Sequence, residues 1–246
     1  PIPSRGLGDV YKRQDHNVVL NRIDGHALMA NKRAILTAKI NPDTTIYGGH
    51  IEIINHELTG IFVDNAMDLI LNHVPIPSEE TNKKALITAQ NTCFSLGLTT
   101  VDIAGLTKGS VELIDKLHNS EELKIKTYIM LTDNEENFNH YVINSNGPIK
   151  TKKMNVRSFK FFADGSLGSR GACLINPYLD NQRTHGQLLQ NIDTFNTKLN
   201  TLKLYGFQAC THAIGDSANR IITSSYANVL SGSNDLRWRI EHVQCI

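Results

Sequence analysis

The sequence predicts an α/β protein, an incomplete (β/α)8 barrel of the TIM type, and three observations support this prediction. Five strand-like runs, near residues 98, 126, 159, 207 and 237, alternate with helix-like runs, which is typical of a parallel sheet. The five units fit into about 150 residues, the spacing that such barrels have. No G-x-G-x-x-G or Walker sequence follows any strand. We therefore expect a barrel without its first and last strands and not a doubly wound sheet.

The composition is that of an ordinary globular protein. Hydrophobic residues make up 40% of the 246 residues and charged residues 20%, enough to bury a core. The net charge of +1 argues against a nucleic-acid or membrane surface. No apolar run approaches about 18 residues, so we expect no membrane span. A cytoplasmic location is favoured, with export left open because the native N-terminus is absent.

The two ends of the chain differ from the rest. Residues 1–14 (PIPSRGLGDVYKRQ) have no periodicity and resemble a translated sequencing adaptor, so we exclude them from the fold as non-native. At the other end, the chain stops just after a strand-like run with no closing helix. We expect residues 15–246 to be the central part of one barrel, in a chain that is a fragment at both ends.

The N-terminal region is predicted from short apolar runs between turns. Residues 18–20 are typical of a strand, and residues 27–39 carry apolar side chains at helical spacing. Residues 41–55 are rich in turn residues, with a short alternating run at 51–53. Residues 60–77 indicate a strand followed by a helix that ends at a Pro-x-Pro stop.

The clearest helix begins at Ser78. Ser78 is a good cap, acidic residues occupy the first turn, and Gly97 ends the helix. A buried strand is expected at 98–103, and further elements follow in alternation: helix 110–118, strand 123–131, helix 135–144, a strand around residue 159, a long loop to residue 186, and helices 192–205 and 217–230.

Three later segments each end near a side chain that can ionise or bind a metal. Lys160 lies inside an aromatic run, His212 ends the run 206–212, and His242 lies near the end of the run 236–243. An ammonium group in an apolar strand is costly unless something neutralises it. Because α/β barrels assemble their sites at the carboxyl ends of their strands, we expect these three side chains to meet.

The same region also has structural interpretations. Lys160 taken alone is more often an ion-paired lysine with a buried stem, and His212 is equally well a hydrogen-bonded core histidine. Asp164 is either an acceptor that orients the loop after Lys160 or the first residue of an Asp-Gly turn. Arg170 either holds a substrate carboxylate or carbonyl or forms a structural ion pair. Glu241 is expected on the strand face that points away from a metal.

Three motifs in order resemble a known family. The stretches 160–170 (KFFADGSLGSR), 211–219 (THAIGDSAN) and 239–244 (RIEHVQ) resemble the pattern of amidohydrolase family 3, the YtcJ-like amidohydrolases. Residues 22–27 (RIDGHA), which include His26, are similar to a further element of that family. The resemblance extends over roughly residues 15–244.

The resemblance implies a metal-dependent barrel hydrolase that acts on carbon–nitrogen bonds outside peptides, through metal-activated hydroxide, on a small amide-like substrate. It implies that Lys160 is carboxylated and bridges two divalent ions, while His212 and His242 are ligands from the next two strands. Zinc is expected, although such ligands also suit manganese, iron, cobalt or nickel.

Three further residues are substrate-binding candidates, namely His26, Asp164 and Arg170. The resemblance places His26 in the substrate pocket. Asp164 and Arg170 lie in the loop that follows Lys160. A homo-oligomer is left open, and no nucleic-acid partner is expected.

The chain departs from the family pattern in two places. The family has a His-x-His pair on its first strand and, on its last, an aspartate that is both ligand and proton shuttle, and neither is present here. We therefore expect an active full-length parent and an inactive chain alone. Two alternatives remain, a Schiff-base lyase that uses Lys160 and a degenerate barrel used for binding.

Overall fold

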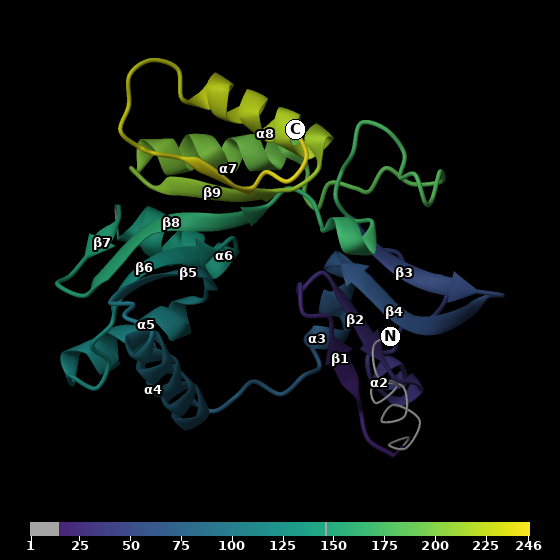
Figure 1. Cartoon of the computed structure of the whole chain (residues 1–246), viewed down its shortest axis with the longest axis horizontal. Coiled ribbons are helices and arrows are strands. Elements are labelled where there is room, and N and C mark those ends of the chain that lie inside the picture. The colour runs from purple at the N-terminus through teal and green to yellow at the C-terminus, as the bar shows by residue number, and fades with distance from the viewer. Residues whose placement is uncertain (1–14, 146) are drawn as a thin grey trace.

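A computed structural model of the chain describes residues 15–145 and 147–246. Residues 1–14, expected to be non-native, lie outside the described residues. The described chain forms two sheets, one with a parallel set of strands and one antiparallel (Figure 1). No helix within these ranges is long and apolar enough to cross a membrane.

The parallel sheet is built from five strands: β5 (Thr100–Leu106), β6 (Lys126–Thr132), β8 (Met154–Phe162), β9 (Gln208–Ala213) and β10 (Arg239–His242). Their order is β10-β9-β8-β6-β5, and each neighbouring pair is parallel. A short strand, β7 (Ile149–Lys150), pairs antiparallel with β8. The prediction of a parallel sheet is confirmed, and the sheet curls as half of a barrel does (Figure 1).

Helices alternate with these strands: α4 (Glu79–Ser95), α5 (Lys108–Asn119), α6 (Glu135–Asn137) with the π-helical η2 (Phe138–Asn144), α7 (Ile192–Leu204) and α8 (Asp216–Val229). The predicted start of α4 is confirmed, because the Ser78 hydroxyl accepts a 3.2 Å hydrogen bond from the backbone N–H of Thr81. Two glutamates occupy its first turn, where negative charge stabilises a helix.

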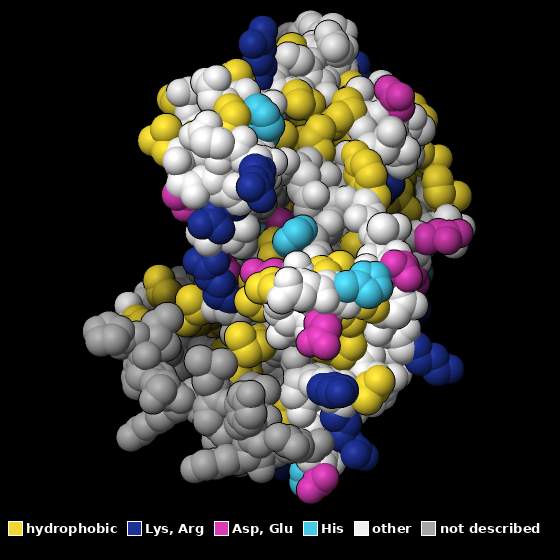
Figure 2. All heavy atoms as spheres, turned by 90° about the vertical axis from the view of Figure 1, so that its right-hand side faces the viewer, with side chains coloured by type: hydrophobic (Ala, Val, Ile, Leu, Met, Phe, Trp, Pro, Cys, Tyr) yellow, Lys and Arg dark blue, Asp and Glu magenta, His cyan; other side chains and the backbone are white. Residues whose placement is uncertain are grey.

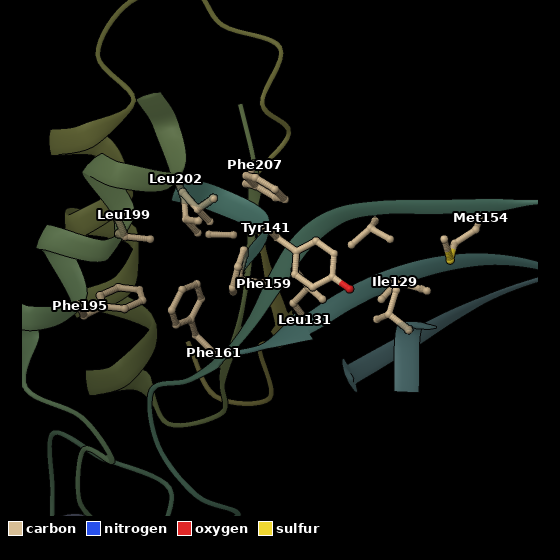
Figure 3. Close-up of a cluster of buried hydrophobic side chains, with 14 of the residues drawn as sticks. Ile129, Leu131, Tyr141, Met154, Phe159, Phe161, Phe195, Leu199, Leu202 and Phe207 are labelled. Carbon is tan, nitrogen blue, oxygen red and sulfur yellow. The ribbon is translucent and has the colours of Figure 1, made fainter. Parts of the chain in front are cut away.

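The main hydrophobic core lies between these helices and the convex face of the parallel sheet. Phe159 and Phe161 of β8 are fully buried there. Figure 3 shows α7 side chains packed toward them, namely Phe195, Leu199 and Leu202. Burying one such side chain contributes about 1.5–3 kcal/mol. Because side chains alternate along a strand, Lys160 and Phe162 lie on the opposite, concave face.

The antiparallel sheet contains the first four strands: β1 (Val19–Asn21), β2 (Ala27–Ala30), β3 (Gly49–Ile54) and β4 (Glu57–Asp64), in the order β1-β2-β4-β3. One face packs on α2 (Lys32–Thr37), η1 (Asn65–Met67) and α3 (Asp68–Leu71) to form a second, smaller core. Within the predicted unit of residues 15–246, residues 19–64 contain this antiparallel sheet and the parallel strands follow it.

The helix predicted at residues 27–39 is wrong in its first part. Ala27–Ala30 is strand β2, paired with both β1 and β4, and α2 covers only Lys32–Thr37. The cause is a tight turn at Gly25, which has φ +76° and whose N–H donates to the carbonyl of Arg22 at 3.0 Å. An Asp-Gly pair favours such a hairpin, so Asp24 and Gly25 were the available signal.

The strand predicted as buried at residues 98–103 is displaced and partly exposed. β5 begins at Thr100 and stands at the end of the sheet order, and the described residues include no strand beyond it. Leu96 is 72% exposed and Leu98 46% exposed. Apolar composition predicted a buried strand, but the burial of a strand depends on the elements that pack against it.

Candidate functional site

Lys160 lies on the concave face of β8, buried between β6 and β9. It is opposite Thr132 on one side and Cys210 on the other. Its Nζ sits 3.6 Å from the centre of the Phe162 ring, a cation–π geometry. Burial lowers the pKa of Lys160 to about 8, against an opposing effect of Glu241. Lys160 is therefore an amine that gives up its proton far more easily than an exposed lysine does.

His212, on β9, is almost completely buried. Its Nε2 lies 3.2 Å from the carbonyl oxygen of Gly165 and 3.5 Å from a carboxylate oxygen of Asp164. Burial, opposed by the bond to Gly165, lowers the pKa of His212 to about 3, so the ring is neutral near pH 7. Because a carbonyl oxygen only accepts, Nε2 carries the proton and Nδ1 keeps a lone pair that can bind a metal.

His242 reaches the same place from the end of β10. Its ring centre is 4.6 Å from that of His212. In the strand register His242 is paired with Ala213, on the helix side of the sheet. Both His242 and Val243 have positive φ, +77° and +48°, and this change of backbone direction lets the ring approach His212. Burial lowers the pKa of His242, and the positive charge of Lys160 acts in the same direction.

Asp164 joins the loops that follow β8 and β9. Its buried carboxylate accepts backbone hydrogen bonds from Cys173 (2.8 Å), Ile214 (2.9 Å) and Gly215 (2.8 Å). Burial raises the pKa of Asp164, and these bonds oppose the rise. Asp164 is thus an acceptor that fixes the loop after Lys160 next to His212.

His26 lies beside His212 and comes from the start of the antiparallel sheet. The two ring centres are 4.9 Å apart, and the Phe162 ring is 6.2 Å from His26 in an edge-on arrangement. The Nδ1 atom of His26 bonds to the carboxylate of Asp64 at 2.8 Å. The sequence analysis did not identify Asp64. Many structural aspartates end an apolar strand as Asp64 does, so only its contact with His26 in the folded chain distinguishes it.

Arg170 does not join this group. Its guanidinium forms a two-pronged pair with Asp180, with distances of 3.0–3.2 Å. Arg170 also lines a cavity of about 990 Å³ between the antiparallel sheet and the loop containing residues 168–187. On the face shown in Figure 2, basic side chains are interspersed with acidic and apolar ones.

The expected orientation of Glu241 is wrong. In the register Glu241 is paired with His212, and its carboxylate pairs with Arg239 at 2.5 Å. Its charge acts on Lys160, so Glu241 lies on the same concave face. The prediction assumed that Glu241 and the metal-facing His242 point to opposite faces, as neighbours in a regular strand do. The positive φ of His242 breaks this alternation.

The donor set fits part of a metal shell. No three or more His, Cys, Asp or Glu side chains in the described ranges are grouped to hold a metal ion. Lys160, however, has an amine of lowered pKa that can be carboxylated, and His212 has a free imidazole lone pair. His242 adds a second imidazole beside it. The chemistry is suitable for zinc-type ions, while the number of ligands is incomplete.

A parallel sheet with ionisable side chains at the carboxyl ends of adjacent strands is where α/β enzymes place their sites. A sequence model of the protein family described as "Amidohydrolase family" matches residues 9–246 of the chain. The chain therefore belongs to the amidohydrolase family.

Two curated relatives match most of the chain. It is 27% identical over 241 residues to Protein LONG AFTER FAR-RED 3 of Arabidopsis thaliana, covering 92% of this chain and 41% of that protein. It is 29% identical over 211 residues to Putative amidohydrolase YtcJ of Bacillus subtilis (strain 168), covering 83% and 39%. The chain thus spans about two fifths of the length of these relatives.

Two solved structures have a similar fold. One is an uncharacterized metal-dependent hydrolase from Pyrococcus furiosus, with TM-score 0.65 and 26% identity, covering 87% of this chain and 44% of that one. The other, an uncharacterized metal-dependent hydrolase from Pyrococcus horikoshii, has TM-score 0.67 and 20% identity and covers 92% and 48%. At that identity the second comparison bears on the fold alone.

Proposed function

We propose that the full-length protein is a metal-dependent hydrolase of carbon–nitrogen bonds outside peptides, and that this chain is the central part of its (β/α)8 barrel. One observation carries the proposal. Lys160, His212 and His242 converge from β8, β9 and β10, the lysine with a lowered pKa and the imidazole rings in contact. The family membership and the Pyrococcus furiosus hydrolase support the same reaction class.

The three residues would hold two divalent ions, with zinc expected. Lys160 would bind as a carbamate, formed when its amine adds carbon dioxide and releases a proton, and His212 would bind through Nδ1. When bound, the ions polarise a substrate carbonyl and lower the pKa of a water molecule toward about 7. The remaining ligands, a His-x-His pair and an aspartate, would come from the rest of the protein.

The protein groups around the site would bind and orient the substrate. Asp164 keeps the loop after Lys160 in place through its three backbone bonds, so its role in substrate binding would be indirect. His26 would contact an amide-like substrate from the side of the antiparallel sheet. Arg170 would bind a carboxylate or carbonyl at the wall of the cavity.

A lyase that uses Lys160 as a Schiff-base nucleophile is the second candidate. The observation in its favour is the same lowered pKa, which leaves about a tenth of the amine neutral near pH 7. The two imidazoles beside Lys160 favour metal binding over this alternative.

A substrate panel with the full-length protein tests the proposal. N-formyl and N-acetyl amines should release free amine, the activity should be lost with a chelator, and added zinc should restore it. Borohydride in the presence of small aldehydes and ketones should leave Lys160 unmodified. Activity that is indifferent to chelator, together with trapping on Lys160, would instead establish the lyase.

A further inference from the structure

Asp64 is a buried carboxylate that bonds to His26 and is enclosed by the loop after Lys160. It ends β4 with φ +52° and ψ −127°, which lies outside the left-handed helical region and is a conformation that residues other than glycine rarely adopt. Its side chain is 0% exposed, and Oδ2 has no hydrogen-bond partner among the described residues. A Cβ added at Gly165 or Gly171 would collide with this carboxylate. The loop after Lys160 therefore closes tightly over Asp64.

The bond between Asp64 and His26 decides which nitrogen of His26 carries the proton. A carboxylate oxygen accepts hydrogen bonds, so the 2.8 Å contact places a proton on Nδ1 of His26. In the neutral ring Nε2 then presents a lone pair. No described residue forms a hydrogen bond with Nε2. The atom is also absent from the buried side-chain atoms that lack a partner, so it remains accessible to solvent.

The neighbouring histidine has the opposite arrangement. The Gly165 carbonyl requires the proton of His212 on Nε2, which leaves Nδ1 as the acceptor. Two imidazoles 4.9 Å apart are thus each fixed by a different protein acceptor. A carboxylate that holds a histidine in one tautomer is a recurring device for aiming its other nitrogen at a reacting group.

We propose that Asp64 is a positioning residue that fixes the Nδ1–H tautomer of His26, so that Nε2 accepts a hydrogen bond from the N–H of an amide substrate. The substrate half of this inference rests on the proposed hydrolase function, whereas the tautomer half does not. The substrate class that follows is primary and secondary amides, because a tertiary amide has no N–H to offer.

Long-range proton–nitrogen NMR on the full-length protein with ¹⁵N-labelled histidine tests the tautomer, at a pH where the rings are neutral. Wild-type His26 should show a protonated Nδ1 and an acceptor Nε2. Asp64→Gly removes the carboxylate and suits the positive φ, and it should shift His26 toward the Nε2–H form. His118 is the internal reference, since its Nε2 faces the carbonyl of Ile125 at 3.0 Å and should stay protonated in both proteins.

The wild-type spectrum decides the first half even if Asp64→Gly fails to fold. A protonated Nε2 on wild-type His26 overturns the proposal, and so does an unchanged Nδ1–H form in a folded Asp64→Gly protein.

Two probes test the substrate half. N-methylacetamide, which has an N–H, should shift the Nε2 resonance of His26 in wild type, while N,N-dimethylacetamide should not, and Asp64→Gly should lose the difference. Equal responses to both probes, or none, overturn the acceptor role. Neither the tautomer spectrum nor the probe titration needs catalytic turnover. A negative result in either one is therefore distinct from failure of the hydrolase proposal, which the chelator experiment tests.

Discussion

At the scale of single residues, Asp164 ties together backbone from three places, Cys173, Ile214 and Gly215. Replacing it with alanine leaves three backbone N–H groups without their acceptor, and each such loss costs about 1–3 kcal/mol. We predict that Asp164→Ala lowers the free energy of unfolding in urea by on the order of 3 kcal/mol or more.

Asp180→Ala is the matched control, because Asp180 lies in the same loop but pairs with Arg170 at the surface. It should change the unfolding free energy little. Equal effects of the two substitutions would show that Asp164 does not hold the loops together.

Residue chemistry was predictable where a side chain was out of place in its own segment. Lys160 in an aromatic strand and His212 at a strand end are visible in the sequence, and the fold brings both together with His242. Asp64 was not predictable, because its hydrogen-bond partner His26 is 38 residues away and the glycines that close over it, Gly165 and Gly171, are about one hundred residues away. Only a contact map separates such an aspartate from an ordinary strand end.

At the scale of elements, α5 carries a buried histidine in its last turn. His118 bonds through Nε2 to Ile125, and burial lowers its pKa, so the folded state favours the neutral ring. An unfolded histidine has a pKa of about 6.5 and takes up its proton first as the pH falls. The stability that comes from the neutral ring is therefore complete above that pH and is lost as the pH falls toward the folded pKa.

We predict that His118→Gln reduces the slope of unfolding free energy against pH below about 6.5. Urea unfolding at several pH values measures this slope. His56→Gln, at an exposed position, is the control. Parallel curves for wild type and His118→Gln would contradict the prediction.

A helix or strand was predictable from the sequence when residues at its ends, such as a helix cap, mark where it begins or stops. The helix from Ser78 has a cap and an acidic first turn, and the structure confirms its start. β2 has only four residues, and its strand character comes from pairing with β1 and β4. Helical spacing of apolar residues could not reveal that pairing, whereas the Asp-Gly turn before it could have.

At the scale of the whole molecule, β5 is the last strand of the parallel sheet within the described residues, and apolar residues lie beside it. Leu98 is 46% exposed, and unpaired edges with such neighbours favour association. We predict that the 246-residue chain alone self-associates in light scattering and that Leu98→Lys reduces this. Leu204→Lys, at the exposed last residue of α7, should not.

The full-length protein should respond in the opposite way. If further barrel strands cover β5, Leu98→Lys should destabilise it by burying an unpaired charge. No loss of stability there would mean that the edge stays open and that the barrel is not completed at β5.

The central claim is that Lys160, His212 and His242 form part of a two-metal centre, and metal analysis of the full-length protein tests it most directly. We predict about two divalent ions per chain in wild type and about one or fewer in Lys160→Ala. Lys198→Ala, which removes a lysine of helix α7 that pairs with Asp133, should keep the wild-type content. A wild-type protein without stoichiometric metal, or a Lys160→Ala variant that keeps all of it, would contradict the account.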